Sequence, residues 1–328
     1  MDTARILITS AFLRPGDETD LALKQHGFDT VHAPLRGPRP PGELEDLLSD
    51  VSAVIAGSDR FDDRAIASAP DLRVIARTGV GYDSIDTAAA SSHGVAVCNA
   101  PGVNSDAVAE LALTFILMLA RRVPEAMRSV REGAWARPTG IQLDGATLGI
   151  VGLGAIGRTV AHHGQTLGMN VIAHDPYADP GYAADHGIEL LDLDRVLAAA
   201  DFISLHIALT PETHHLIDER ALRRMKKTAY LINTARGPVV DERALVAALD
   251  AGELAGAALD VVEEEPLAVS STLRDHPRAF VTAHIGGSTS QARDESARVA
   301  VSCVVDILHG RTPRSVVNPE YLQHLVTG

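Results

Sequence analysis

One stretch in the middle of the chain constrains its fold more than any other. Thr147–Val151 is a short run of β-branched and aliphatic residues, which predicts a buried strand. Three glycines follow it in the spacing G-x-G-x-x-G: Gly152, Gly154 and Gly157. A helical pattern then covers residues 156–167, and a second apolar run, Asn170–His174, ends at Asp175. The sequence therefore predicts a strand, a glycine turn, a helix, a second strand and an acidic residue in succession.

Each part of this succession suits the binding of a dinucleotide. The first glycine permits a tight turn, the second lets the backbone approach a pyrophosphate, and the third lets the helix pack closely on the strand. Unpaired amides and the dipole at the helix N-terminus attract the phosphates. Asp175 follows at the distance of about 20 residues at which an acid accepts hydrogen bonds from a ribose. A purely structural turn is the alternative, but the two strands and the acid favour dinucleotide binding.

Length and composition indicate a cytoplasmic protein of two domains. A chain of 328 residues with 46% hydrophobic residues can form two packed cores. No apolar run reaches the roughly 18 residues of a membrane span, and the N-terminus lacks the basic and long apolar parts of a signal peptide. The net charge of −14 argues against a nucleic-acid partner. Cys98 and Cys303 lie among apolar residues and are expected to be reduced core thiols.

The first hundred residues predict a small parallel α/β domain. Four apolar runs are expected to form its strands: Ala4–Ser10, Val51–Ala56, Leu72–Ala76 and Val95–Cys98. Ligands of such sheets bind at the carboxyl ends of the strands, so Gly57–Arg60 and Arg77–Tyr82 are candidate binding loops. Successive amides at 79–81 can hold a carboxylate, although an ordinary glycine turn would have the same sequence. Pro34–Pro41 is expected to be a rigid loop.

Beyond the glycine turn, the pattern predicts further α/β units. Four more strands would complete a six-stranded doubly wound sheet: Asp201–Leu205, Ala229–Asn233, Ala257–Asp260 and Ala279–Ala283. The helical segment after this sheet is too short for a third domain and is expected to return to the first one. The predicted domains are therefore a discontinuous first domain, 1–101 with 289–328, and an inserted nucleotide-binding domain, 102–288.

A long helix is predicted over Asn104–Arg121, directly after the break at Pro101–Gly102. It is apolar nearly all round, so we expect it to be buried, and it has too few polar residues to face water on any side. This pattern predicts a homodimer. Trp135, the single tryptophan, follows in a loop.

Three ionisable residues come just after successive strands of the nucleotide-binding domain: Arg236, Glu265 and His284. The carboxyl ends of parallel strands share one edge, where the cofactor is also expected. An arginine can bind a substrate carboxylate and carbonyl through its fork of donors. A histidine can act as acid and base in a carbonyl–alcohol interconversion, and a glutamate can orient the imidazole. Each residue alone has a structural alternative: a helix cap, a solvated acidic run or a core histidine.

Together, these motifs resemble the D-isomer-specific 2-hydroxyacid dehydrogenase family. The similarity runs from about Val51 to Asn318 and includes GLGAIG, HDPY, LINTARGPVVDERAL, GAALDVVEEEP and the turn at 284–287. The resemblance implies a Rossmann NAD-binding domain inserted into a discontinuous, flavodoxin-like substrate-binding domain. It also implies a homodimer and hydride transfer between NAD and a small D-2-hydroxy acid or 2-keto acid.

The resemblance also implies roles for residues. Arg236 would bind the substrate, Glu265 would assist the histidine, and His284 would exchange the proton. Further substrate contacts are implied at Val80, Gly81 and Asn104. Cofactor contacts are implied at the glycine turn and at the ends of the following strands: Gly152, Gly154, Ala155, Ile156, Gly157, Asp175, His206, Thr234, Asp260 and Gly286.

Two other functions stay open. The first is D-3-phosphoglycerate dehydrogenase, whose members typically place an arginine after the Val51–Ala56 strand to bind the substrate phosphate. Gly57 stands there in this chain, although Arg36, Arg39 or Arg60 could substitute. A small unphosphorylated acid is therefore preferred. The second is a non-enzymatic, NAD-sensing corepressor-like protein. No metal is expected, because the adjacent histidine pairs at 162–163 and 214–215 diverge on a helix.

Overall fold

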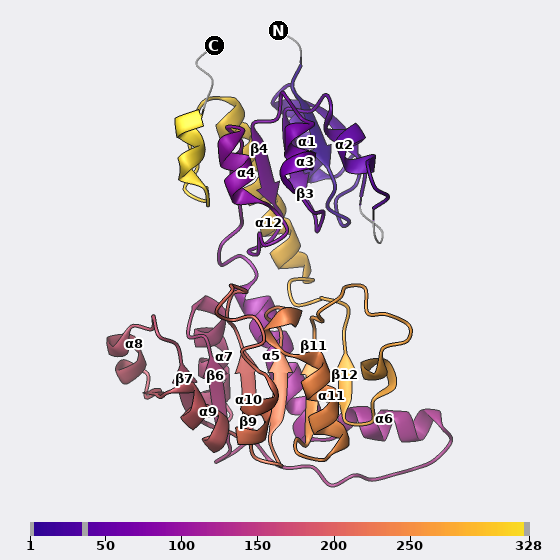
Figure 1. The fold of residues 1–328 in the computed structure, drawn as a ribbon, viewed down its shortest axis with the longest axis vertical. Helices are drawn as coiled ribbons and strands as arrows, with labels where there is room; N and C mark the ends of the chain where they lie inside the picture. Colours follow the sequence, from indigo (N-terminus) through magenta and orange to yellow (C-terminus); the bar gives the residue numbers. More distant parts are fainter. Residues whose placement is uncertain (1–2, 35–38, 325–328) are drawn as a thin grey trace. The chain divides into compact units, whose positions relative to one another are not determined.

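The chain folds into two compact units, one inserted into the other (Figure 1). The structure is a computed structural model that describes residues 3–34 and 39–324. The first unit comprises Met1–Asn104 and Ser288–Gly328, and the second comprises Ser105–Gly287. The fold class predicted from the sequence is confirmed, because each unit is built on its own parallel sheet. Part of the predicted loop at 34–41, including Arg36, lies outside the described residues.

The first unit contains a five-stranded parallel sheet with the strand order β2-β1-β3-β4-β5. Its strands are β1 (Arg5–Ile8), β2 (Asp29–His32), β3 (Ala53–Ala56), β4 (Val74–Arg77) and β5 (Ala96–Cys98). Its helices are α1 (Glu18–Gln25), α2 (Glu43–Leu48), α3 (Asp63–Ala67), α4 (Thr87–Ser92), α12 (Ser290–Leu308) and the 3₁₀ helix η3 (Pro319–His324). After the chain returns from the second unit, α12 packs its Ala300 and Val304 into the core around Ile6 and Ile8.

The second unit contains a seven-stranded parallel sheet with the strand order β12-β11-β10-β9-β6-β7-β8. Its strands are β6 (Thr147–Val151), β7 (Asn170–His174), β8 (Glu189–Leu190), β9 (Phe202–Leu205), β10 (Tyr230–Asn233), β11 (Gly256–Leu259) and β12 (Ala279–Val281). Its helices are α5 (Ser105–Ala120), α6 (Val123–Arg131), α7 (Ala155–Thr166), α8 (Pro180–Asp185), α9 (Leu193–Ala199), α10 (Glu219–Arg224) and α11 (Glu242–Asp250), with short 3₁₀ helices at η1 (Gly237–Val239) and η2 (Thr272–Asp275).

Both sheets are covered on their two faces, which explains their nearly continuous apolar strands. In β6, Ile150 and Val151 are both fully buried but belong to different hydrophobic clusters, because successive side chains point to opposite faces. Several of the covering helices begin at an aspartate whose side chain accepts a hydrogen bond from an amide of the first turn: Asp17, Asp62, Asp86, Asp218 and Asp241.

Two strands of the structure were absent from the sequence-based predictions. The sheet of the second unit has seven strands rather than six, because Glu189–Leu190 adds an edge strand that pairs with β7. Two residues are too short to show alternation. Among the described residues of the first unit, the sheet has five strands rather than four. The additional strand, Asp29–His32, lies at an edge and has no fully buried residue, so its polar sequence gave no apolar signal.

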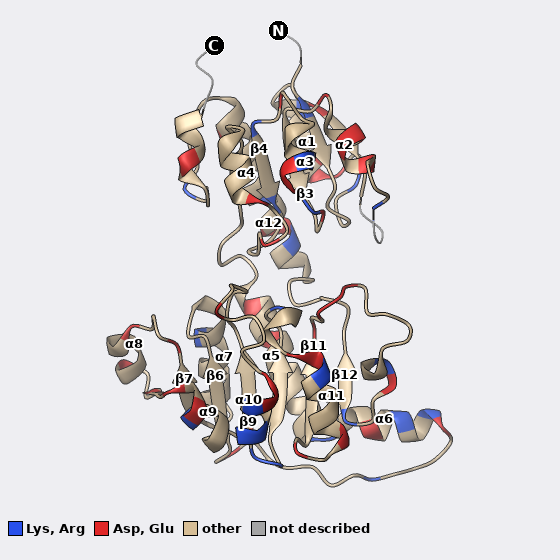
Figure 2. Cartoon of the chain, viewed as in Figure 1, with Lys and Arg blue, Asp and Glu red and all other residues tan. Residues whose placement is uncertain are grey.

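The surface carries charges of both signs. Blue and red segments alternate over both units in Figure 2, although the net charge is −14. None of the helices in the described part of the chain has the length and apolarity needed to cross a membrane.

Candidate active site

The glycine turn after β6 has the tight packing that the sequence motif predicts. Gly152 has a φ of 95°, and a Cβ there would lie 2.6 Å from the carbonyl oxygen of His206. A Cβ on Gly157 would lie 2.0 Å from the carbonyl oxygen of Gly152. Side chains at these two positions would therefore separate α7 from the sheet. Gly154 differs, because a Cβ there would have no neighbour within 4 Å, so its α-carbon faces open space.

Helix α7 begins directly at this open side of the turn. Gly154 is its N-cap residue and supplies no side-chain hydrogen bond. The amides of Ala155 and Ile156 belong to the first turn of the helix, where no backbone acceptor precedes them. These amides and the helix dipole form a suitable site for a pyrophosphate.

Asp175 follows β7 and is held rigidly beside the turn. One carboxylate oxygen accepts a hydrogen bond from the amide of Leu153 at 2.8 Å, and the other accepts one from the amide of Tyr177 at 2.8 Å. The carboxylate is partly exposed, and its remaining lone pairs can accept bonds from two ribose hydroxyls. Its charge would repel a 2′-phosphate.

Two buried polar atoms without hydrogen-bond partners lie at the ends of β9 and β10. They are Nδ1 of His206 and Oγ1 of Thr234. The other ring nitrogen of His206 lies 2.8 Å from Oγ of Ser204. Burial lowers the pKa of His206 to about 3, so the ring is neutral at physiological pH. Buried polar groups are normally satisfied, and these two suit a polar cofactor that supplies the missing partners.

Asp260 organises the turn that carries the predicted acid–base histidine. Its carboxylate is almost fully buried and accepts hydrogen bonds from the Thr282 hydroxyl at 2.6 Å and from the amides of Ile285 and Gly286 at 2.8 and 2.7 Å. Its backbone carbonyl accepts a bond from the His284 amide at 2.8 Å. The structure therefore shows Asp260 and Gly286 as parts of the support for the turn.

His284 and Glu265 form a hydrogen-bonded pair on this edge. The Nδ1 atom of His284 lies 2.8 Å from Oε2 of Glu265, and both side chains are partly exposed. His284 has a φ of 51°, a left-handed conformation that is uncommon for a residue with a side chain and is often found at functional sites. Because Nδ1 donates to the carboxylate, Nε2 is the ring atom that remains for proton exchange with a ligand.

Arg236 follows β10 in a turn fixed by a buried asparagine. The side chain of Asn233 donates to the carbonyl of Arg236 at 2.9 Å and accepts from the amide of Ala235 at 3.0 Å. A Cβ on Gly237 would lie 1.9 Å from the backbone of Val262, so this turn packs directly against the segment after β11. The strand order β12-β11-β10 therefore places Arg236, Glu265 and His284 at the ends of three neighbouring strands.

In the first unit, the backbone carbonyl groups of the predicted carboxylate-binding turn all accept hydrogen bonds from the protein. The carbonyl of Gly79 accepts from the amide of Ala100, that of Val80 from the Asn99 side chain, and that of Gly81 from Nε of Arg77. Within the described chain, the amides of residues 79–81 donate no hydrogen bond, so they suit an anionic ligand.

Asn104, the other predicted substrate contact of the first unit, also has an unsatisfied atom. Its Oδ1 is buried and has no hydrogen-bond partner. Sequence reasoning missed the residues that support the site, which include Asn99, Ser204, Asn233 and Thr282. The available signal was that each is a polar residue in the last two positions of a strand or directly after it. No cluster of three or more histidines, cysteines or acids that could hold a metal occurs among the residues described here.

Comparison with known proteins identifies the family. Residues 113–286 match the profile of the "D-isomer specific 2-hydroxyacid dehydrogenase, NAD binding domain". A glyoxylate reductase from Thermofilum pendens is 38% identical, with 98% of this chain and 97% of the relative aligned. A D-3-phosphoglycerate dehydrogenase from Synechocystis is 40% identical over 84% of this chain, which spans only 50% of that relative.

Solved structures agree with these matches. The TT0316 protein from Thermus thermophilus superposes with a TM-score of 0.88 at 37% identity, covering 95% of this chain and 99% of that one. A glyoxylate reductase from Paecilomyes thermophila superposes with a TM-score of 0.84 at 31% identity, covering 98% and 99%. The fold and the dinucleotide turn thus define an NAD-dependent oxidoreductase. The chain belongs to the D-isomer specific 2-hydroxyacid dehydrogenase family, which confirms the predicted family and cofactor.

Proposed function

We propose that the protein interconverts a small, unphosphorylated 2-keto acid and the corresponding D-2-hydroxy acid. The observation that carries this proposal is the 2.8 Å pair of Glu265 and His284 on the same sheet edge as the glycine turn and Arg236. An acid–base histidine, a cationic substrate-binding residue and a dinucleotide turn are the groups that a hydride transfer to a carbonyl requires.

Each group has a separate role in the proposed reaction. The bound NADH supplies the hydride. The amides of Val80 and Gly81 are assigned to the substrate carboxylate, and the guanidinium of Arg236 is assigned to the substrate carbonyl, which it polarises. His284 donates a proton from Nε2 to the carbonyl oxygen as the alcohol forms, while Glu265 orients the ring and stabilises its charged form through Nδ1. In the oxidative direction the same nitrogen accepts the proton.

Gly57, which stands where an arginine typically binds the substrate phosphate, supports an unphosphorylated substrate. The backbone around Gly57 leaves no room for a side chain, because a Cβ there would lie 2.9 Å from the carbonyl oxygen of Thr9. Arg39 is largely buried and already engaged, donating to Asp59 at 2.6 Å, to Glu43 at 2.7 Å and to the Ala33 carbonyl at 2.9 Å. A buried phosphate dianion without a cationic partner would be costly.

One observation favours phosphoglycerate dehydrogenase as the second candidate. Arg60 lies in the loop after β3, is exposed, and has no partner in the described part of the chain. It could bind a substrate phosphate in place of a residue at position 57. The 40% identity to the phosphoglycerate dehydrogenase of Synechocystis is consistent with this reading.

The test compares kcat/KM with NADH for glyoxylate, hydroxypyruvate and phosphohydroxypyruvate, in the wild type and in Arg60→Ala. We expect the unphosphorylated acids to be better substrates and the variant to leave their order unchanged. A clear preference of the wild type for phosphohydroxypyruvate that is lost in Arg60→Ala would establish the second candidate. Turnover of none of these acids would contradict the proposed substrate class.

The active form is proposed to be a homodimer in which a second copy covers the arm at residues 122–142. The arm includes α6, which projects from the second unit in Figure 1 and carries the exposed side chains of Met127 (46% exposed) and Val130 (53%). The loop after α6 adds two more exposed apolar side chains, Trp135 (74%) and Ile141 (47%). Leu117 of α5 is also 40% exposed. Apolar groups gathered on one projecting element are typical of a subunit interface.

A further inference from the structure

Both cysteines of the chain lie in the core of the first unit, although they are far apart in sequence. Cys98 ends β5, and Cys303 lies in the middle of α12. Cys98 pairs with Val316 in an antiparallel bridge, and the Asn99 amide donates to the carbonyl of Ser315 at 3.2 Å. The sulfur of Cys303 lies 3.0 Å from the hydroxyl of the same Ser315. Residues 315–316 therefore adjoin both cysteines, which belong to one hydrophobic cluster, and the proximity of each thiol shifts the pKa of the other.

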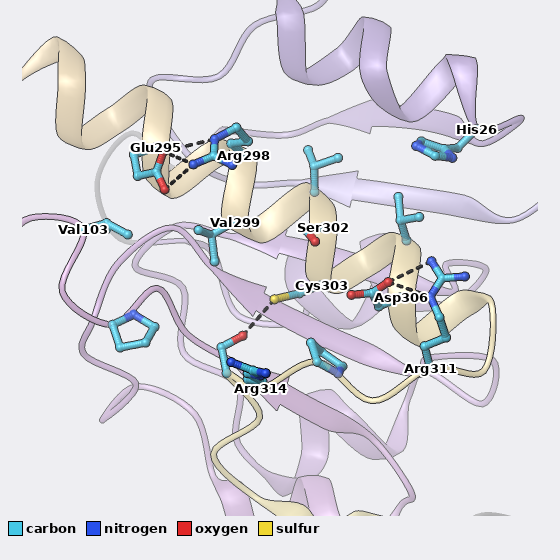
Figure 3. Close-up of a pocket in the computed structure, with 15 residues that line it drawn as sticks. His26, Val103, Glu295, Arg298, Val299, Ser302, Cys303, Asp306, Arg311 and Arg314 are labelled. Atoms are coloured by element: carbon cyan, nitrogen blue, oxygen red, sulfur yellow. Dashed lines mark hydrogen bonds and ion pairs between the residues drawn. The ribbon is translucent and has the colours of Figure 1, made fainter.

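Both cysteines are buried, at 0% and 2% exposure, but only Cys303 belongs to the lining of a surface pocket. Cys303 lines a cavity of about 750 Å³ beside α12, and Figure 3 shows its sulfur directed from the helix toward the segment that carries Arg314. Cys98 is fully buried and does not line this cavity. A small reagent that enters the cavity can therefore reach Cys303 first and Cys98 only through it.

The surroundings of Cys303 also favour its reactive form. The neighbouring Cys98 and Ser315 lower the pKa of Cys303, against the opposing effects of burial and of the Asp306 charge. The neighbouring Cys303 and burial both raise the pKa of Cys98. The cavity is lined by arginines at 298, 311 and 314 and by two carboxylates, of which Glu295 pairs with Arg298 and Asp306 with Arg311, so Arg314 is the lining cation that adds positive charge for an anionic reagent. The thiolate is the nucleophile in exchange with disulfides, so Cys303 is suited to attack and Cys98 to resolve.

We propose that Cys98 and Cys303 form a dithiol site that small anionic disulfides oxidise to an intramolecular disulfide. The Cys303 thiolate attacks one sulfur of the reagent RSSR, forms a mixed disulfide and releases RS⁻. The Cys98 thiol transfers its proton to RS⁻, attacks the Cys303 sulfur and displaces the second RS⁻, which takes a proton from solvent. The proton that the second RS⁻ takes from solvent balances the proton that Cys303 released to solvent when its thiolate formed. Two protein thiols are thereby oxidised and one RSSR is reduced to two RSH.

The new bond would join the two elements that adjoin the crossings between the units. Residues after β5 lead to the first crossing at Asn104, and α12 begins just after the second at Ser288. A bond from Cys98 to Cys303 would close a loop that contains the whole second unit. Such a long loop restricts the unfolded chain strongly, so the oxidised protein should have the higher Tm.

The test treats native full-length protein with oxidised glutathione and then alkylates the remaining thiols in denaturant before mass spectrometry. Because the chain has only two cysteines, an unalkylated product lighter than the reduced chain by two hydrogen atoms is the proposed disulfide. We expect this product in the wild type. Cys98→Ser should stop at the mixed disulfide on Cys303, and Cys303→Ser should leave Cys98 unmodified.

Two results would overturn the proposal. One is a wild type in which both thiols are alkylated after treatment of the native protein, while treatment in denaturant does oxidise them. The other is a wild type that accumulates the mixed disulfide without closing the second bond. If the serine variants fail to fold, the thiol count and the Tm of the treated wild type still decide between these outcomes.

Discussion

Asp175 shows how one carboxylate selects the cofactor. Its two oxygens are fixed by the amides of Leu153 and Tyr177, so it cannot swing away from a 2′-phosphate. We expect kcat/KM to favour NADH over NADPH by about 100-fold, the factor that a coupling of ~2.7 kcal/mol gives at 1.4 kcal/mol per decade. Asp175→Ala should reduce this preference to about tenfold or less. Equal efficiency with the two cofactors in the wild type would contradict the assignment.

The burial of His206 makes the stability of the folded protein sensitive to acid. Burial lowers the pKa of His206 to about 3 from its ordinary value of 6.5, so between these pH values the unfolded chain binds a proton that the folded chain does not. Stability is therefore lost as the pH falls from 6.5 toward 3, by at most about 1.4 kcal/mol per pH unit. His206→Gln should flatten this dependence in urea titrations at pH 7, 6 and 5. If the unfolding free energies of the two proteins fall equally with decreasing pH, the lowered pKa of His206 is refuted.

At the scale of elements, the glycine turn offers two substitutions with opposite consequences. A methyl group on Gly157 would collide with the carbonyl of Gly152 at 2.0 Å, whereas one on Gly154 would meet nothing within 4 Å. Gly157→Ala should therefore destabilise the second unit and lower its Tm. Gly154→Ala should keep the wild-type Tm but weaken NADH binding by about tenfold or more, because its methyl group stands where the pyrophosphate approaches. Unchanged NADH affinity in Gly154→Ala would place the cofactor elsewhere.

Strongly apolar strands were predictable, while polar or very short ones were not. The limits of β6 and β7 follow directly from their β-branched runs. Strands β2 and β8 are defined by pairing with a neighbouring strand at the sheet edge, and the sequence of an edge strand does not report its partner. In the site, residues at strand ends were predictable because parallel strands share one edge. The supporting bonds of Asp260 and Asn99 depend on tertiary contacts that sequence spacing does not contain.

At the scale of the whole molecule, the exposed apolar side chains of α6 predict association of two chains. Figure 2 shows charges of both signs on α6, consistent with Glu125, Arg128 and Arg131, so a second copy can pair with both its charged and its apolar residues. Light scattering at micromolar concentration should give twice the chain mass. Val130→Glu should shift the protein toward the monomer, whereas Leu21→Glu, at a similarly exposed position of α1, should not. A monomeric wild type would refute the dimer.

The proposed activity depends on His284 as the donor of the proton in the reduction of a 2-keto acid. The most direct measurement is kcat for NADH oxidation with saturating hydroxypyruvate or glyoxylate in the wild type and in His284→Ala, with the Kd of NADH measured on both by fluorescence. General acid catalysis by one residue contributes about 10²- to 10⁴-fold, so we expect His284→Ala to lose that much of kcat with the Kd of NADH nearly unchanged. A variant that keeps kcat within a few-fold of the wild type would show that His284 does not supply the proton.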